Sequence, residues 1–159
     1  MNRAPLLLTV TMLLAACAVQ AGSSPSAGPT GGIDGVEELV AALSNGQAQA
    51  RQGGTFDSAP LTGQGVLLCV GREEVRTYVY RTAQERAAAA GQIDPNDPSH
   101  IGSSIAEWMG NPRFWQSGRI IVLYLGSDAR TEALLTSVMG PPFARGVGGG
   151  LGAPTVSAC

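Results

Sequence analysis

The sequence predicts a small α+β domain, with a mainly antiparallel sheet, helices on one face and the element order αβββαββα. Three observations predict this class: segments with helix-capping residues and helical apolar spacing, strand-like runs between turn signals, and one continuous apolar run near residue 120. The chain has 159 residues and 44% of them are hydrophobic. That length suits one domain better than two.

Capping residues mark the starts of the three expected helices. Asp34 is followed by Glu37 and Thr82 by Glu85, and this spacing is typical of a capping box. The second helix is rich in alanine, so it can lie close to a sheet. A third helix is expected to start near Asp128. The apolar positions of the first and third helices are Val36, Leu39, Val40, Leu43, Leu134, Leu135 and Val138.

The strand pattern is clearest on either side of Gly71, where an apolar run and an alternating run indicate a β-hairpin. Residues 119–126 form the most hydrophobic stretch after the first seventeen residues, so we expect the central strand there. The remaining strands are indicated more weakly. The full set of expected strands is 47–51, 66–70, 74–80, 104–109 and 119–126, with bends at 110–112 and 116–118.

The first residues have the three parts of a secretory signal: a basic head with Arg3, an apolar segment at 6–14, and small side chains. At ~1.5 Å per residue the apolar segment is too short to cross ~30 Å of hydrocarbon as a helix. It ends in Leu14-Ala15-Ala16-Cys17, which resembles the lipobox of bacterial lipoproteins.

This resemblance implies that a peptidase removes residues 1–16 and that Cys17 carries the lipid. The membrane, bound through that lipid, is then the first expected partner. We expect a protein held at the cell membrane or outer membrane and facing outside the cytoplasm. The alternative is that Cys17 follows an ordinary signal and remains a thiol or enters a disulfide.

The composition divides the rest of the chain into three parts. Residues 17–32 lack apolar periodicity and predict a flexible lipidated tether, and residues 145–159 are rich in glycine and predict a tail. The folded domain is therefore expected at 33–144. With 12 acidic residues against 10 basic ones, the chain offers no basic stripe for a nucleic-acid partner.

The second half of the domain resembles a group of short, uncharacterised bacterial lipoproteins. The residues that carry this resemblance are Trp108, Pro112, Phe114, Trp115, Gly118, Arg119, Ile120, Ile121, Val122, Leu123, Tyr124, Gly126, Asp128, Gly140, Pro141, Phe143 and Ala144. The resemblance implies a small lipid-anchored α+β domain and brings no known activity.

Catalytic and metal-binding patterns are weak. The single histidine, His100, precedes the serines of Gly102-Ser103-Ser104, opposite to the order of the usual nucleophile elbow. The 94–99 loop is rich in Asp and Asn but lacks the spacing of a calcium loop, so turn formation is the expected role. We expect no cofactor, no metal and no enzyme activity, with a hydrolase using His100 as the weakest alternative.

Two further groups leave alternatives open. Cys69 and Cys159 could form a disulfide in an oxidising compartment, or Cys69 could remain a buried thiol. Trp108, Phe114 and Trp115 could pack in the core or form an exposed interaction patch. The expected role is a non-catalytic interaction or envelope-associated module, with an envelope protein as partner; a carrier of small molecules or lipids is the alternative.

Overall fold

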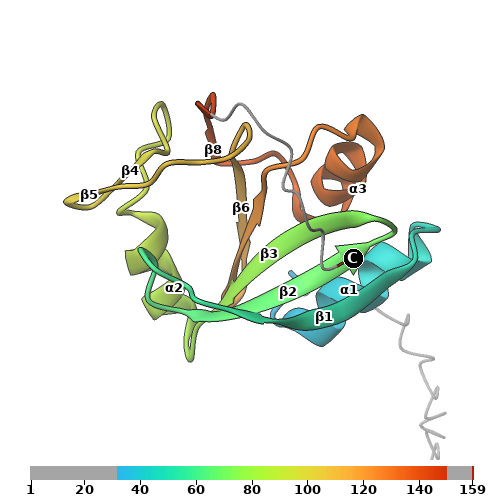
Figure 1. Cartoon of the computed structure of the whole chain (residues 1–159). Helices are drawn as coiled ribbons and strands as arrows, with labels where there is room; N and C mark the ends of the chain where they lie inside the picture. Colours follow the sequence, from blue (N-terminus) through green and yellow to red (C-terminus); the bar gives the residue numbers. More distant parts are fainter. Residues whose placement is uncertain (1–31, 150–158) are drawn as a thin grey trace, which may run out of the picture.

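The computed structural model describes residues 32–149 and Cys159. Cys17, with the expected signal segment and most of the expected tether, lies outside the described residues. The core is a six-stranded sheet in the order β1-β2-β3-β7-β6-β8, and each pair of neighbours is antiparallel (Figure 1). The elements are α1 (Val36–Asn45), β1 (Ala50–Phe56), β2 (Gln64–Val70), β3 (Glu73–Val79), α2 (Ala83–Ala90), β4 (His100–Ile101), β5 (Ser104–Ile105), β6 (Arg113–Ser117), β7 (Ile120–Tyr124), α3 (Ala129–Met139) and β8 (Ala144–Arg145).

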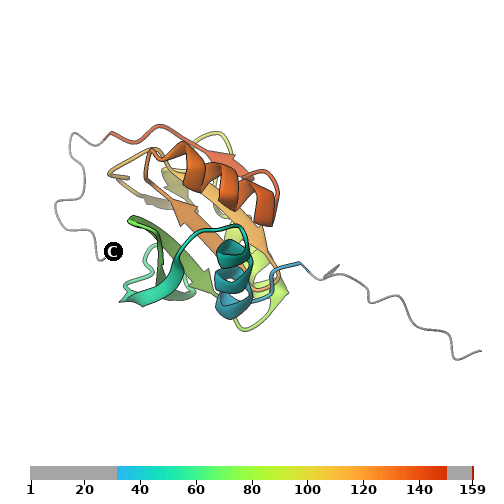
Figure 2. The same cartoon turned by 90° about the vertical axis from the view of Figure 1, so that its right-hand side faces the viewer.

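The α+β class and the antiparallel sheet are confirmed, but the helices lie on both faces of the sheet. Because successive strand residues point to opposite faces, the buried residues form two clusters. Helices α1 and α3 pack on one cluster, and α2 packs on the other with Ala89 and Ala90. Figure 1 shows α2 apart from the other two helices, and Figure 2 shows α1 and α3 together on the side facing the viewer. The expected single helical face thus holds for two of the three helices.

The two strongest strand predictions are confirmed. All five residues of β7 are buried, and this strand lies between β3 and β6 near the middle of the sheet. Strands β2 and β3 form the expected hairpin. Gly71 turns it with a φ of +62°, a backbone conformation that glycine adopts without a steric cost.

The segment before β7 differs from the prediction. Residues 104–109 contribute only the short β5, which pairs with β4 in a separate two-stranded sheet. The strand that pairs with β7 is β6, between the two expected bends. Phe114 and Trp115 are consecutive residues of β6, and both are buried, one on each face of the sheet. This strand therefore lacks the apolar and polar alternation that would have revealed it.

The structure also differs from the prediction at both ends of the expected domain, where residues pair with distant segments of the chain. Asp34 is not the N-cap of α1, which is Gly35. The Asp34 carboxylate instead pairs with Arg119 at 3.0 Å, a contact between residues far apart in the sequence. At the other end, β8 pairs with β6, so the sheet includes Arg145 from the expected tail.

No helix in the described part of the chain is long and apolar enough to cross a bilayer.

Candidate functional site

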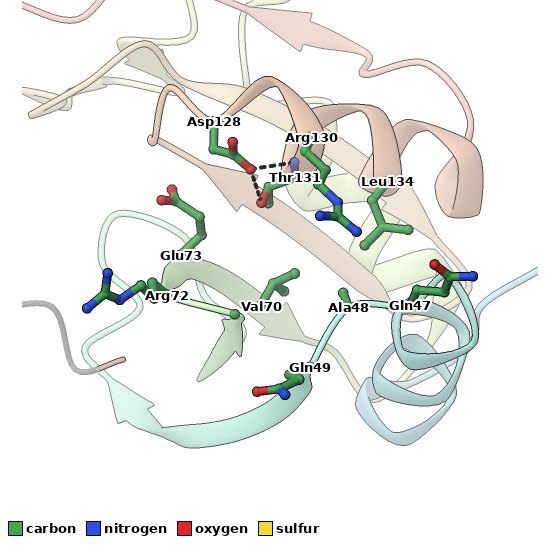
Figure 3. A pocket seen from close by; sticks show the side chains of 11 residues that line it. Gln47, Ala48, Gln49, Val70, Arg72, Glu73, Asp128, Arg130, Thr131 and Leu134 are labelled. Carbon is green, nitrogen blue, oxygen red and sulfur yellow. Dashed lines mark hydrogen bonds between the residues drawn. The ribbon is translucent and has the colours of Figure 1, made fainter.

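A cleft of about 320 Å³, lined by both polar and apolar side chains, opens where three segments meet: the loop between α1 and β1, the β2–β3 turn, and the first turn of α3 (Figure 3). The β2–β3 hairpin places one wall, and the N-cap of α3 places another. The lining residues are Gln47, Ala48, Gln49, Val70, Gly71, Arg72, Glu73, Asp128, Arg130, Thr131 and Leu134.

Two carboxylates form the acidic side of the cleft, on either side of the Tyr124 hydroxyl. Tyr124 donates a hydrogen bond to Glu73 Oε2 at 2.6 Å and accepts one from the backbone N–H of Asp128 at 3.0 Å. Burial, and then the hydrogen bond to Glu73, raise the pKa of Tyr124. The tyrosine therefore stays protonated and donates its proton to the carboxylate.

Asp128 is also the N-cap of α3, as its position in the sequence predicts. Its Oδ2 accepts hydrogen bonds from the Thr131 N–H at 2.8 Å and from the Thr131 hydroxyl at 2.7 Å. The hydrogen bond from the Thr131 hydroxyl, and then that from the Thr131 N–H, lower the pKa of the Asp128 carboxyl. Asp128 is thus ionised near neutral pH, and its orientation is set by the helix.

The opposite side of the cleft carries a cation and two amides. Arg130 points from α3 toward the segment that contains Gln47 and Gln49, whereas Arg72 points away from the cleft (Figure 3). Across residues 32–149, most arginines have ion pairs or side-chain hydrogen bonds. Arg51, Arg72 and Arg130 have neither, although the charge of Arg130 helps to lower the pKa of the Asp128 carboxyl; the Arg130 guanidinium can still donate hydrogen bonds to a ligand.

The floor between these two sides is apolar. Val70 is buried at the end of β2, and Leu134 packs from α3 against the same core cluster. Ala48 contributes a methyl group from the loop. The arrangement is a small cleft with an acidic end, a basic and amide-rich end, and a hydrocarbon floor. Such a cleft can bind and orient a small polar molecule.

The Asp- and Asn-rich loop forms the turns that its composition predicts. Asp94 Oδ1 accepts from the backbone N–H of Asn96 at 2.8 Å, and Asp97 Oδ1 accepts from the Ser99 N–H at 3.2 Å. Among the described residues, no group of three or more His, Cys, Asp or Glu is placed to hold a metal ion.

His100 lies at the start of β4, with its side chain more than half exposed. Its Nδ1 lies 2.8 Å from Asp97 Oδ2 and 3.5 Å from the Ser99 hydroxyl, which donates to Asp97 Oδ1 at 2.5 Å. Gly102 and Ser103 form the turn between β4 and β5, whereas a nucleophile elbow joins a strand to a helix. Within the described part of the chain, the contacts of His100 stabilise the 94–99 loop.

The three aromatic side chains do not form an exposed patch. Trp115 and Phe114 are completely buried, on opposite faces of the sheet, and Trp108 is 8% exposed. Trp108 donates its indole N–H to the Pro98 carbonyl at 2.9 Å and meets Phe114 edge to face. The patch interpretation is wrong because this small domain has few other large side chains to fill its two cores.

Cys69 and Cys159 are joined by a disulfide, one of the two arrangements that the sequence left open. Cys69 is fully buried on β2. It lies against Gly53 of β1, where an added Cβ would be 3.0 Å from the Cys69 sulfur. The missing side chain at Gly53 leaves room for the disulfide beside the edge strand. The bond ties Cys159 to the second strand of the sheet.

The cleft itself was missed by sequence reasoning. Its charged and amide side chains come from three segments, and none of these has a motif of its own. The only local signal is at Asp128, whose position predicts the start of a helix. Comparison of the chain with family models, curated proteins and solved structures found no match to any of them.

Proposed function

We propose that this protein is a lipid-anchored extracytoplasmic binding module without catalytic activity, attached to a membrane through Cys17 and associated with the cell envelope. In this proposal the tether of residues 17–32 leads to the folded domain, and the cleft is the binding site. The lipobox-like residues 14–17 supply the anchor. Two or three acyl chains on one cysteine would make that attachment durable.

The observation that carries the proposal is the disulfide between Cys69 and Cys159. Disulfides persist in oxidising compartments and are rare in the cytosol. A bond of this kind is therefore expected of a domain that is exported. The disulfide and the signal-like residues lie in different parts of the chain, and both support a location outside the cytoplasm.

The cleft favours the binding of a polar molecule over the transport of a lipid. A lipid carrier needs an enclosed apolar cavity, whereas this cleft has charged and amide groups around a small apolar floor. The contacts of His100 give less support to a hydrolase, because Asp97 and Ser99 both approach the same ring nitrogen, Nδ1, whereas a catalytic triad uses one imidazole nitrogen for each.

The anchoring part of the proposal is tested by metabolic labelling with a palmitate analogue in a bacterial host. The full chain should be labelled and should fractionate with membranes, whereas Cys17→Ser should be unlabelled and released from them. Gly149→Ala is the control, because it lies outside the leader, has open space for a methyl group and should keep both the label and the fold. An unlabelled wild-type protein, or wild-type protein found in the cytosol, would refute the proposal.

A further inference from the structure

We propose that the cleft binds a small zwitterion of the size of a dipeptide. Its amine would lie beside Glu73 and Asp128, and its carboxylate beside Arg130 and the amides of the 47–49 segment. This inference deepens the proposed function, because it takes the cleft as the binding site and names the chemical class of the ligand. It does not depend on whether Cys17 is lipidated.

The separation of charge in the cleft is the first argument. An isolated anion such as phosphate would be attracted by Arg130 but repelled by Glu73 and Asp128. An isolated cation would meet the opposite combination. Asp128 and Arg130 both come from the start of α3, but Glu73 lies at one end of the cleft and Arg130 points toward the other end (Figure 3), so a molecule with both charges can contact both ends.

Preorganisation of the acidic side is the second argument. Glu73 is held by the Tyr124 hydroxyl, and Asp128 is held by Thr131 at the start of α3. Within the described residues, Glu73 Oε1 has no hydrogen-bond donor and is left for a ligand amine. The Asp128 carboxylate is held by Thr131 and also interacts with the backbone N–H of Arg130, so its contribution to the amine end is mainly its charge. The ordering of these side chains costs little on binding, because the fold has already fixed them.

The size and floor of the cleft are the third argument. Its volume of about 320 Å³ lies near the lower end of the usual range for ligand pockets, roughly 300–1,000 Å³. The occupant is therefore small. The apolar floor of Val70, Leu134 and Ala48 matches a short aliphatic side chain between the two charged ends.

The test titrates the dipeptide Ala-Leu into the full-length protein in detergent micelles and measures binding by calorimetry. N-acetyl-Ala-Leu, which lacks the amine, and Ala-Leu amide, which lacks the carboxylate, are titrated in parallel. We expect Ala-Leu to bind and each blocked peptide to bind about tenfold more weakly or not at all, since a hydrogen bond to a charged group contributes roughly 1.5–3 kcal/mol.

Variants assign the two ends of the ligand. Arg130→Gln should weaken Ala-Leu binding about tenfold but leave the weak binding of Ala-Leu amide unchanged. Glu73→Gln can still accept the hydrogen bond from Tyr124. It should weaken Ala-Leu binding and leave the weak binding of N-acetyl-Ala-Leu, which has no amine, unchanged. Arg51→Gln is the matched control, because Arg51 is an exposed arginine on β1 without an ion pair and outside the cleft. Far-ultraviolet circular dichroism checks that each variant is folded.

Three results would overturn the inference: no binding of Ala-Leu at millimolar concentration, equal binding of the blocked peptides, or equal weakening by Arg51→Gln and Arg130→Gln. The same titration on full-length Cys17→Ser separates this inference from the proposed function. Binding there without lipid labelling of the wild type would refute the anchor and support the ligand. Labelling of the wild type without binding would do the reverse.

Discussion

Loss of the disulfide between Cys69 and Cys159 is expected to destabilise the domain strongly. The bonded residues are 90 positions apart in the sequence. In the chain-entropy model, a loop of this length restricts the unfolded chain by about 4.6 kcal/mol at 25 °C. The Cys159 sulfur also lies 3.9 Å from the Leu68 carbonyl oxygen. Domains have a free energy of unfolding of only about 5–15 kcal/mol.

The measurement is urea unfolding of full-length Cys17→Ser, compared with Cys17→Ser/Cys159→Ala, followed by tryptophan fluorescence. The second variant should have a lower free energy of unfolding by about 4–5 kcal/mol. Its melting temperature should be lower by roughly 15–20 °C for a domain of this size. Reductant should lower the stability of the first variant to that of the second, and should leave the second unchanged.

A difference below about 1 kcal/mol would refute the reasoning. It would mean either that the bond does not form in solution or that the unfolded chain is already compact enough for loop closure to matter little. Non-reducing mass spectrometry of the first variant distinguishes these explanations, because two alkylated cysteines would show that the bond is absent.

The remaining predictions concern the core, one turn and the tyrosines. Trp115 is fully buried, so Trp115→Ala should cost about 3–5 kcal/mol in urea unfolding, and a near-neutral result would restore the patch interpretation. Gly118 has a φ of +43°, and an added Cβ would lie 2.4 Å from the Asp34 Cα. Gly118→Ala should therefore lower the melting temperature of the protein. Gly149→Ala should not lower it, because no heavy atom lies within 4 Å of an added Cβ there. Burial raises the pKa of Tyr78 and of Tyr80 to about 12, and that of Tyr124 is also raised. Because folding favours the protonated phenols, their contribution to stability is fully present below about pH 10 and is lost as the pH rises toward 12; an ultraviolet titration of the folded protein with normal tyrosinate formation near pH 10 would contradict this.

Local signals in the sequence were sufficient for several parts of the fold. The β2–β3 hairpin depends on a glycine turn between an apolar run and an alternating run, and the caps at Thr82 and Asp128 bond to the residue three positions later. The central position of β7 follows from its composition, since a run without polar side chains must be covered on both faces. In each case the interacting groups are neighbours in the chain, or the requirement is burial alone.

Other features were decided only when distant segments met. Asp34 has a capping pattern, but Arg119 pairs with its carboxylate. Strand β6 is defined by its hydrogen bonds to β7 and β8, because its adjacent buried aromatics obscure the alternation. Helix α2 lies on the face opposite α1 and α3, although its sequence specifies only that one side is small.

By itself, then, the sequence determined the class of the domain, its principal hairpin, its central strand and two of its helix caps. Tertiary structure alone decided the bond between Cys69 and Cys159, the burial of Trp115 and the cleft that brings Glu73 and Arg130 together. The physical reason is range. Propensity and capping act within a few residues, whereas a disulfide, a shared core and a cleft depend on which surfaces the folded chain places side by side.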